Sequence, residues 1–370
     1  MINHIPASCL CVLVVDTNSY TELTLSKQGE KLMAKYRVGL IGCGARQNDH
    51  VKAFREVSSC EIVAVADIVE EARKGFAEKH NIPKLYSSVK EMIESENIDI
   101  VTSVTRPLWA KTPVLEAMQT GVKGILMEKP FGVNIEEAKE MLDFAESTGT
   151  ALLVNHQYRF FEVTEQMRQI ILSGELGDVE FFRSISAIKL HGQGTHMIDF
   201  VRFLYDDRPF VWALGNFAGK DSFDAKQIGP DYDVGIVMFD NGVPMYVESG
   251  SGSTQAPYMG NGLNLYADAV CTKGRIWFGL SHGLRIWRND GKYEEVPAKW
   301  PDISDPAQVC LVEDLINTIE TGKTSRCDAR KAYATQEAMC ALLESAITHQ
   351  KVQIPLNIAP DLMERVRSSM

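Results

Sequence analysis

The hydrophobic positions divide the chain into two parts with different periodicities. From residue 36 to about residue 154, short apolar runs alternate with longer amphipathic stretches, a pattern typical of parallel strands joined by crossover helices. It predicts strands at 37–42, 61–66, 98–104, 123–127 and 151–154, a short extra strand at 84–86, and helices near 47–57, 69–80, 88–95, 110–120 and 134–148.

After residue 155, apolar and polar residues alternate along short segments separated by turns such as Asp240-Asn241-Gly242. A period of two predicts antiparallel strands, which we expect at 179–190, 211–217, 234–239, 243–248, 263–271, 274–278 and 284–288. Helices are expected near 163–173, 196–204, 306–321 and 328–348, and a last strand at 352–356. The second part is therefore predicted to be an antiparallel sheet flanked by helices.

This pattern, with a length that exceeds what one core usually serves, predicts two domains. We expect residues 34–155 to form the first, residues 156–356 the second with closing helices over 306–348, and residues 357–370 a tail. Residues 1–33 are expected to be a non-native or disordered extension. Their apolar run from Ser8 to Val15 has no preceding Lys or Arg, unlike a signal peptide, and we expect translation to begin at Met33.

Composition narrows the classes of function. The 370 residues are 45% hydrophobic and 24% charged, as in an ordinary soluble protein. The net charge of −11 disfavours nucleic acid and anionic membranes as partners, and no apolar run reaches membrane-spanning length. The eight cysteines show no C-x-x-C spacing, which favours reduced thiols in a cytoplasm and no metal site.

The first predicted strand runs into Gly42-Cys43-Gly44, the start of a dinucleotide fingerprint. Gly42 permits a tight turn, and Gly44 has no Cβ to keep the backbone from a pyrophosphate, whose charge the following helix N-terminus favours. Gln47 stands where the third glycine is expected, so the helix should pack less closely or start slightly displaced. Together with the strand–helix alternation, this predicts a doubly wound parallel sheet of the Rossmann type.

The second strand ends at Asp67, where a carboxylate can accept both hydroxyls of an adenosine ribose. Asp67 can also cap the helix that begins near Val69. Because Asp67 would repel a 2′-phosphate, NAD is the expected cofactor. Arg46 leaves NADP open, since a guanidinium near the ribose can accommodate that phosphate.

A third feature is the apolar run from Gly124 to Met127, which ends on Glu128-Lys129-Pro130. In open α/β sheets the carboxyl ends of the strands border the ligand crevice, so Lys129 is expected to face a ligand. For the tripeptide alone, the alternative is a solvated ion pair that closes a strand before a proline-started helix.

These motifs resemble the glucose-fructose oxidoreductase, inositol dehydrogenase and MocA family over residues 36–356. The resemblance implies an N-terminal Rossmann domain, then a domain with a large open, mostly antiparallel sheet flanked by helices, and a homodimer or homotetramer formed through that sheet. The motifs that carry it, by their order and spacing, are Gly42-Cys43-Gly44, Val65-Ala66-Asp67, Glu128-Lys129-Pro130, Tyr158-Arg159-Phe160, the segment 174–179, and Gly194-Thr195-His196-Met197-Ile198-Asp199.

For chemistry, the resemblance implies an NAD(P)-dependent dehydrogenase that transfers a hydride between nicotinamide and a secondary hydroxyl of a sugar, inositol or related polyol. Alcohol oxidation needs a base for the hydroxyl proton, and Lys129 and His196 match the family's residues for that work. The cationic nicotinamide is expected to lower the pKa of Lys129, and the peptide between Lys129 and Pro130 is expected to be cis. Asp199 shares a helix face with His196 and can orient it or a substrate hydroxyl.

The expected contacts fall into two sets. Tyr158 and Arg159 have a second interpretation, as an interdomain clamp. The residues expected to bind the cofactor are Gly42, Gly44, Ala45, Arg46, Gln47, Asp67, Thr105, Glu128 and Lys129. The residues expected to bind the substrate are Lys129, Asn155, Tyr158, Arg159, His191, Thr195, His196 and Asp199, with Tyr258, Met259 and Asn261 as further candidates in a loop.

Two departures from the family pattern bear on this site. Gly192 stands where many members have an aspartate four residues before the histidine, so the proton relay is left to Lys129, His196 or a substitute such as His191, which is otherwise a loop histidine. In the segment 105–111, Trp109 can cover the nicotinamide, and Arg106 or Lys111 can meet an anionic group, or all three can pack at a domain interface.

Two other functions of the same fold remain open at this point. One is an NAD-dependent glycosidase, which oxidises a sugar transiently and eliminates its aglycone. The other is a non-catalytic sensor that binds the cofactor, which Gly192 favours and the pair Lys129 and His196 disfavours.

Overall fold

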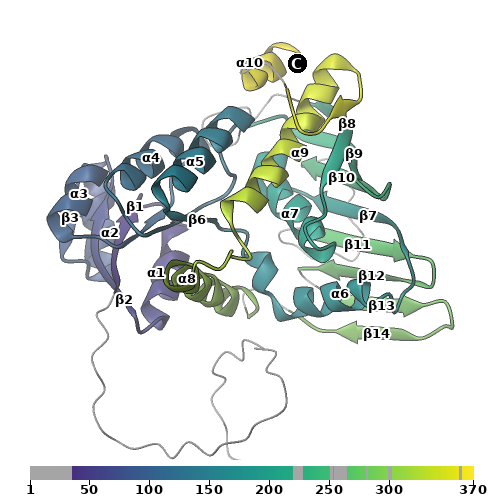
Figure 1. Cartoon of the computed structure of the whole chain (residues 1–370), viewed down its shortest axis with the longest axis horizontal. Helices are drawn as coiled ribbons and strands as arrows, with labels where there is room; N and C mark the ends of the chain where they lie inside the picture. Colours follow the sequence, from purple (N-terminus) through teal and green to yellow (C-terminus); the bar gives the residue numbers. More distant parts are fainter. Residues whose placement is uncertain are drawn as a thin grey trace, which may run out of the picture.

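The structure is a computed structural model that describes residues 36–219, 228–250, 253, 265–280, 282–298, 302–357 and 361–370. The expected extension over residues 1–33 and the loop candidates Tyr258, Met259 and Asn261 lie outside these ranges. Within them, no helix combines the length and the apolar character that crossing a membrane requires. The described chain forms two sheets, with helices between and around them (Figure 1).

The first sheet has six parallel strands in the order β3-β2-β1-β4-β5-β6. This is the strand order of a Rossmann sheet, as the sequence predicted. Chain order reverses between β1 and β4, so the ligand crevice of such a sheet lies outside the carboxyl ends of these two strands. The strands are β1 (Tyr36–Ile41), β2 (Cys60–Ala66), β3 (Lys84–Tyr86), β4 (Ile100–Ser103), β5 (Gly124–Met127) and β6 (Ala151–Val154).

Crossover helices join these strands, each within two residues of its predicted bounds. Their ends show the expected chemistry: Asn134 caps one helix by accepting a hydrogen bond from the backbone N–H of Glu137 at 2.8 Å. The helices are α1 (Gln47–Glu56), α2 (Glu70–His80), α3 (Val89–Glu96), α4 (Lys111–Gln119) and α5 (Ile135–Thr148), with a 3₁₀ turn, η1 (Pro107–Trp109), before α4.

The second sheet has nine strands in the order β14-β13-β12-β11-β7-β10-β9-β8-β15. Only β10 and β7 pair in parallel among the described strands of this sheet, so it is mostly antiparallel, as predicted. The strands are β7 (Val179–Ser186), β8 (Phe210–Ala218), β9 (Tyr232–Phe239), β10 (Pro244–Gly250), β11 (Leu265–Cys271), β12 (Gly274–Gly279), β13 (Gly283–Arg288), β14 (Tyr293–Val296) and β15 (Val352–Gln353).

Helices cover one face of this second sheet, where large side chains such as Phe182, Phe200 and Phe239 form the main core (Figure 1). These helices are α6 (Glu162–Leu172), α7 (Thr195–Leu204) and α9 (Ala329–Thr348), with a 3₁₀ turn, η2 (Gln157–Phe160), before α6.

Three predictions about the second part were wrong in detail, one of them the last strand, which was expected over 352–356 and spans only Val352–Gln353. The strand expected over 179–190 ends at Ser186, because the Ser186 hydroxyl accepts from the N–H of Ile188 and donates to its carbonyl, in place of ladder bonds. A π-helical turn, η3 (Leu190–Gly194), follows. The tail expected over 357–370 contains a further helix, α10 (Leu362–Ser368), which buries Leu362 and Val366 in the core.

The helix α8 (Ser304–Thr321), which the sequence grouped with the second domain, packs on the first sheet. Its Leu311 and Leu315 share one buried cluster with Val38 and Leu40 of β1. A Cβ on Gly124 would lie 2.7 Å from Cδ1 of Ile319, so glycine permits the close approach of α8 to β5. The chain therefore returns to its first sheet before it ends, and this return fixes the two sheets relative to each other.

Candidate active site

The glycine turn after β1 has the geometry that a dinucleotide fingerprint requires. Gly42 has φ of 89°, and a Cβ there would collide with the carbonyl oxygen of Val104. At Gly44, the position of a Cβ faces open space, with no heavy atom of a described residue within 4 Å apart from its chain neighbours. Gly42 thus makes the turn, and Gly44 leaves its backbone open to a ligand.

Two buried polar side chains beside this turn lack hydrogen bonds in the described structure. Gln47 is the first residue of α1 and is fully buried, and neither atom of its side-chain amide has a partner. The hydroxyl of Thr105 is also buried and unpaired, and its Cγ2 lies 3.5 Å from where a Cβ on Gly42 would be. Because buried polar groups are normally paired, these atoms fit a polar ligand such as a dinucleotide.

Asp67 is hydrogen-bonded to the backbone on both sides of the end of β2. Its Oδ1 accepts a hydrogen bond from the N–H of Val69 at 2.8 Å, and its Oδ2 accepts from the N–H of Cys43 at 2.8 Å. Asp67 does not cap α2, because Val69 is the N-cap residue of that helix, and its role toward the ribose stays a prediction. An ionised carboxyl offers about four acceptor sites, so Asp67 retains capacity for ribose hydroxyls.

Arg46 lies away from Asp67. Its Nη1 donates to Asp49 at 2.8 Å, and its Nε lies 3.8 Å from Oε1 of Glu128. The guanidinium beside Asp67 belongs to Arg73, which donates to the Asp67 carbonyl at 3.2 Å. In the free protein Arg46 is therefore engaged by acidic neighbours, whereas Arg73 is the guanidinium beside Asp67. Because a guanidinium near the ribose can accommodate a 2′-phosphate, NADP stays open beside NAD.

Glu128 is held ionised at the end of β5 by hydrogen bonds and by nearby positive charge. Nε2 of His50 donates to Oε1 of Glu128 at 3.0 Å, while the Thr102 hydroxyl bonds Nδ1 of His50 at 2.6 Å. The amide of Asn155 donates to the same Oε1 at 2.6 Å. Burial raises the pKa of Glu128, but the hydrogen bond and charge of His50, with Lys129 and Arg46, outweigh it and bring the pKa to about 2.

Lys129 lies next to this carboxylate, and the peptide between Lys129 and Pro130 is cis, as expected. Its Nζ donates to the backbone carbonyl of Gly192 in η3 at 2.7 Å. Burial lowers the pKa of Lys129 to about 8, with the charge of Arg46 adding to this effect and that of Glu128 opposing it. The lysine can therefore exchange a proton near neutral pH, and the backbone at Gly192 takes the hydrogen bond where a family aspartate is missing.

His196, on the first turn of α7, is buried and has no hydrogen bond to either ring nitrogen within the described structure. Its ring stacks on Tyr158 with centroids 4.5 Å apart and meets His156 edge-on at 5.5 Å. Burial lowers the pKa of His196 well below its ordinary value, and the charge of Lys129 adds to this effect. His196 is therefore neutral near pH 7 and has a free proton-accepting nitrogen.

Arg159 and Asp199 do not join this group. Nε and Nη2 of Arg159 donate to the two oxygens of Asp199 at 2.7 and 2.8 Å, and Nη1 and Nη2 donate to Asp207 at 3.0 and 2.7 Å. Arg159 is fully buried. Both residues therefore belong to a buried ion-pair cluster, which contradicts the expectations that Asp199 orients His196 and that Arg159 meets the substrate. We call it the clamp cluster, although it is not the expected interdomain clamp, because its members all come from residues 156–356.

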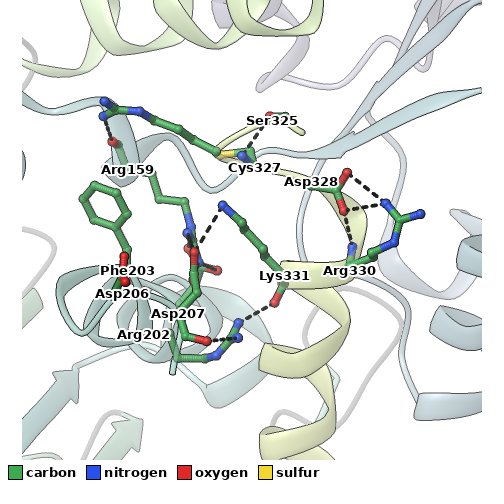
Figure 2. Close-up of polar contacts among 12 residues, drawn as sticks. Arg159, Arg202, Phe203, Asp206, Asp207, Ser325, Cys327, Asp328, Arg330 and Lys331 are labelled. Carbon is green, nitrogen blue, oxygen red and sulfur yellow. Dashed lines mark hydrogen bonds and ion pairs between the residues drawn. The ribbon is translucent and has the colours of Figure 1, made fainter. Parts of the chain in front are cut away.

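This cluster extends toward the helix that closes the fold. Figure 2 shows Asp207 between Arg159 and Lys331 of α9, whose Nζ lies 3.2 Å from Oδ2 of Asp207. The Arg202 guanidinium donates to the backbone carbonyls of Lys331 and Asp207 at 2.7 and 3.3 Å. The cluster ties η2, α7 and α9 together behind the crevice.

The remaining candidates lie either near Glu128 and Lys129 or near the ion-pair cluster of Arg159 and Asp199. Asn155 is committed to Glu128 through its nitrogen, and its buried oxygen is unpaired. The Thr195 hydroxyl bonds Nε2 of His156 at 3.1 Å, and Nδ1 of His156 lies 3.4 Å from Asp199, so Thr195 adjoins the clamp side. His191 in η3 is buried, and within the described residues neither ring nitrogen makes a hydrogen bond of normal geometry, although the backbone of Val133 is close to the ring.

The segment after β4 lies at the surface. Trp109 is 54% exposed, with the Arg106 guanidinium 5.2 Å from its ring centroid, and Lys111 pairs with Glu140 at 2.9 Å. Packing of all three at a domain interface is therefore wrong, whereas a role for Trp109 at the nicotinamide stays a prediction.

One residue of the site, His50, was missed from the sequence, and the partners of a second, His156, were not predicted. His50 follows Gln47 by three residues, so both lie on the buried face of α1, and that shared spacing was the available signal. His156 stands in the polar run that ends β6, but its pairing with Thr195 and Asp199 depends on a segment about forty residues away, which no local pattern gives.

Residues 36–156 match the model of an oxidoreductase family with an NAD-binding Rossmann fold, Gfo/Idh/MocA. This segment belongs to that family. Among curated proteins, a trans-1,2-dihydrobenzene-1,2-diol dehydrogenase of Mus musculus is 34% identical over 150 residues, which is 40% of this chain and 45% of that relative. A D-apiose dehydrogenase of Paraburkholderia graminis is 25% identical over 275 residues, which is 70% of this chain and 71% of that protein.

Solved structures show a likeness in fold that also covers the second sheet. A levoglucosan dehydrogenase in complex with NADH and L-sorbose has a TM-score of 0.77 at 18% identity, over 88% of this chain and all of that one. An oxidoreductase of Agrobacterium radiobacter in complex with NAD+, L-tartaric acid and magnesium has a TM-score of 0.75 at 19% identity, over 87% and 99%. At these identities the likeness establishes the fold alone.

Proposed function

We propose that this protein is an NAD-dependent dehydrogenase that oxidises a secondary hydroxyl of a sugar, inositol or related polyol. One observation carries the proposal: a half-buried lysine with a lowered pKa donates to an oxygen, 2.7 Å away, at the crevice edge of an NAD-binding sheet. Dehydrogenases of a diol, of D-apiose and of levoglucosan among the similar proteins support the same reaction class.

In this proposal the cofactor binds across the glycine turn. Gly44 leaves room for a pyrophosphate, the orphaned atoms of Gln47 and Thr105 bond the dinucleotide, and Asp67 accepts the adenosine ribose hydroxyls. Bound there, a nicotinamide dinucleotide supplies the acceptor for the hydride. Asp67 favours NAD over NADP, because it would repel a 2′-phosphate.

Lys129 and His196 share the handling of the proton. As the hydride leaves the carbinol carbon, the proton of its hydroxyl passes to the neutral amine of Lys129, whose pKa of about 8 places it between free and protonated near neutral pH. The unpaired nitrogen of His196 is a second acceptor for that proton or a hydrogen-bond partner for the same oxygen. Glu128, with a pKa of about 2, stays ionised and fixes the position of its neighbour Lys129.

The uncovered face of the second sheet supports assembly into a homodimer or homotetramer. In one row across that face, Leu214 of β8 pairs with Ile236 of β9, which pairs with Tyr246 of β10. Leu214 is 45% and Ile236 37% exposed, and adjoining exposed apolar residues on a sheet mark interaction surfaces. Light scattering of the purified protein measures this; a monomer at all concentrations contradicts it. A cytoplasmic location is part of the same proposal.

The decisive experiment supplies the full chain with NAD and a panel of sugars, inositols and glycosides, and follows both reduced cofactor and released aglycone. Lys129→Ala is expected to lower turnover by about 10²–10⁴-fold, the range for a general acid–base group, while titration shows little change in NAD affinity. Lys111→Ala is the matched control, because Lys111 pairs with Glu140 on the surface of α4.

Each alternative has its own result. Full turnover by Lys129→Ala overturns the mechanism. Release of aglycone without net reduction of NAD identifies the glycosidase, and NAD binding without turnover of any compound identifies the sensor.

A further inference from the structure

Asp233, near the start of β9, is a buried carboxyl group without a hydrogen bond. Its side chain is 3% exposed, and neither oxygen has a partner in the part of the chain that the structure describes. A buried polar group left unpaired costs about 1–3 kcal/mol, and native structures contain few of them. The role of this carboxyl is therefore not explained by the packing of the free protein.

The position of Asp233 brings it close to the π-helical turn η3. Alternation along β9 places it on the same face as Val237 and Phe239, the face that the helices cover. Directly opposite Asp233 on β10 stands Ser249. Oγ of Ser249 lies 2.6 Å from where a Cβ on Gly194 would be. Asp233 and the end of η3 are thus neighbours of the same serine.

Asp233 is neutral near pH 7. Burial raises its pKa to about 8, against the backbone of Leu190 and the charge of Lys189. The backbone N–H of Leu190 faces this carboxyl and favours its ionised form, but it makes no hydrogen bond of normal geometry to either oxygen. Lys189 is held elsewhere, by the Gly229 carbonyl at 2.8 Å and by Asp231 at 3.1 Å. A protonated carboxyl both donates and accepts a hydrogen bond.

The turn η3 links this carboxyl to Lys129. Its first residue, Leu190, borders Asp233, and the carbonyl of its third, Gly192, takes the hydrogen bond of Lys129. Further unpaired buried atoms lie on the same turn, at the ring of His191 and at Oε1 of Gln193. Single π-helical turns of this kind are frequent at functional sites. The unpaired groups therefore gather around the one segment that occupies the oxygen-binding position of Lys129.

We propose that Asp233 recognises the substrate by hydrogen-bonding a hydroxyl other than the one that is oxidised, once the turn has moved away from Lys129. This inference rests on the proposed function. A hydroxyl donates and accepts, which matches a neutral carboxyl. An anionic ligand group would meet no unpaired cation there, because Lys189 is already neutralised by Asp231.

The test measures KM for the best polyol of the screen and for each of its monodeoxy analogues. Asp233→Leu removes the carboxyl and keeps a side chain of similar size. It is expected to raise KM about tenfold to a hundredfold, because the substrate loses a buried hydrogen bond and its hydroxyl is left without a partner. The change in kcat is expected to be smaller. The unfolding midpoint of this variant is expected to stay equal or rise, because the carboxyl has no partner in the free protein. Asp233→Asn keeps a neutral donor and acceptor and should retain KM within a few-fold.

The analogues supply a test that does not depend on a variant. In the wild-type protein, removal of one hydroxyl that is not oxidised should raise KM about tenfold or more, and Asp233→Leu should abolish that discrimination. The inference is overturned if no such hydroxyl exists, or if Asp233→Leu or, where that variant does not fold, Asp233→Ala retains the wild-type KM. Loss of turnover in Lys129→Ala, run in parallel, shows that the proposed function stands even when the role of Asp233 fails.

Discussion

Two clusters of charged and polar residues share the helix α7, which carries His196 of one and Asp199 of the other, but they differ in how completely they are paired. In the clamp cluster, formed by Arg159, Asp199 and Asp207, every side-chain nitrogen and charged oxygen has a partner. In the crevice cluster, formed by Lys129, His191 and His196, four ring nitrogens have none within the described residues. Burial and charge are common to both clusters, so incomplete pairing is what marks the one prepared for a ligand.

The two histidines beside Tyr158 give the largest expected contrast. His196→Phe keeps the stacked ring and removes two unpaired nitrogens, so turnover should fall by about 10²–10⁴-fold while the free energy of unfolding stays equal or rises. His156→Phe removes a ring bonded to Thr195 and Asp199, and should lower the free energy of unfolding by about 1–3 kcal/mol. Steady-state kinetics and urea denaturation of both variants check this, and equal destabilisation would erase the distinction.

Breaking the clamp should act on stability. Arg159→Met leaves Asp199 and Asp207 buried without their cation, and the free energy of unfolding should fall by about 3–5 kcal/mol. Arg208→Met, which removes a surface pair with Asp240, is the control and should cost about 1 kcal/mol or less. Denaturant titration measures both. A stable Arg159 variant with a raised KM would return Arg159 to the substrate site.

The smallest expected effect is a shift in the pH dependence of the reaction, which tests the crevice cluster. Lys129 must be neutral to accept a proton, so kcat/KM for alcohol oxidation should fall about tenfold per pH unit below its pKa of about 8 and level off above it. The charge of Arg46 helps to lower that pKa, so Arg46→Met should move the profile to higher pH. Arg55→Met, on the same helix, should leave it in place. An unmoved profile in Arg46→Met would assign the titration to another group.

Much of the fold was predictable because it depends on local periodicity. Continuous apolar runs gave the six parallel strands within two residues, and the alternation after residue 155 gave the antiparallel sheet. Errors arose where side chains compete with the ladder, as at Ser186, or where a segment packs on distant parts of the chain, as α8 does on β1. Periodicity shows which face of an element is buried but not which element covers it.

The site was predictable only as far as strand ends. Lys129 and Glu128 follow β5, and parallel strands place such residues at one edge, whereas the pairing of Asp199 depends on tertiary packing. Asp199 and His196 share a helix face, and nothing in their spacing shows that a guanidinium from η2 occupies the carboxylate. The sequence did not single out Asp233 for the same reason, because its lack of hydrogen-bond partners depends on the residues that surround it in the fold.

The hydrogen bond from Lys129 to the carbonyl of Gly192 affects the binding affinity of every ligand that reaches this lysine. A ligand oxygen that takes its place exchanges one hydrogen bond for another, so this contact adds little to the net affinity of a ground-state complex. Selectivity among ground-state ligands must then come from groups remote from the reacting carbon. Lys129 contributes mainly where a ligand oxygen carries more negative charge than a peptide carbonyl, as it does when the alcohol is losing its proton. Because the amine of Lys129 already has a hydrogen-bond acceptor in the free protein, a ligand oxygen gains affinity from it only as far as that oxygen is more negative than a peptide carbonyl.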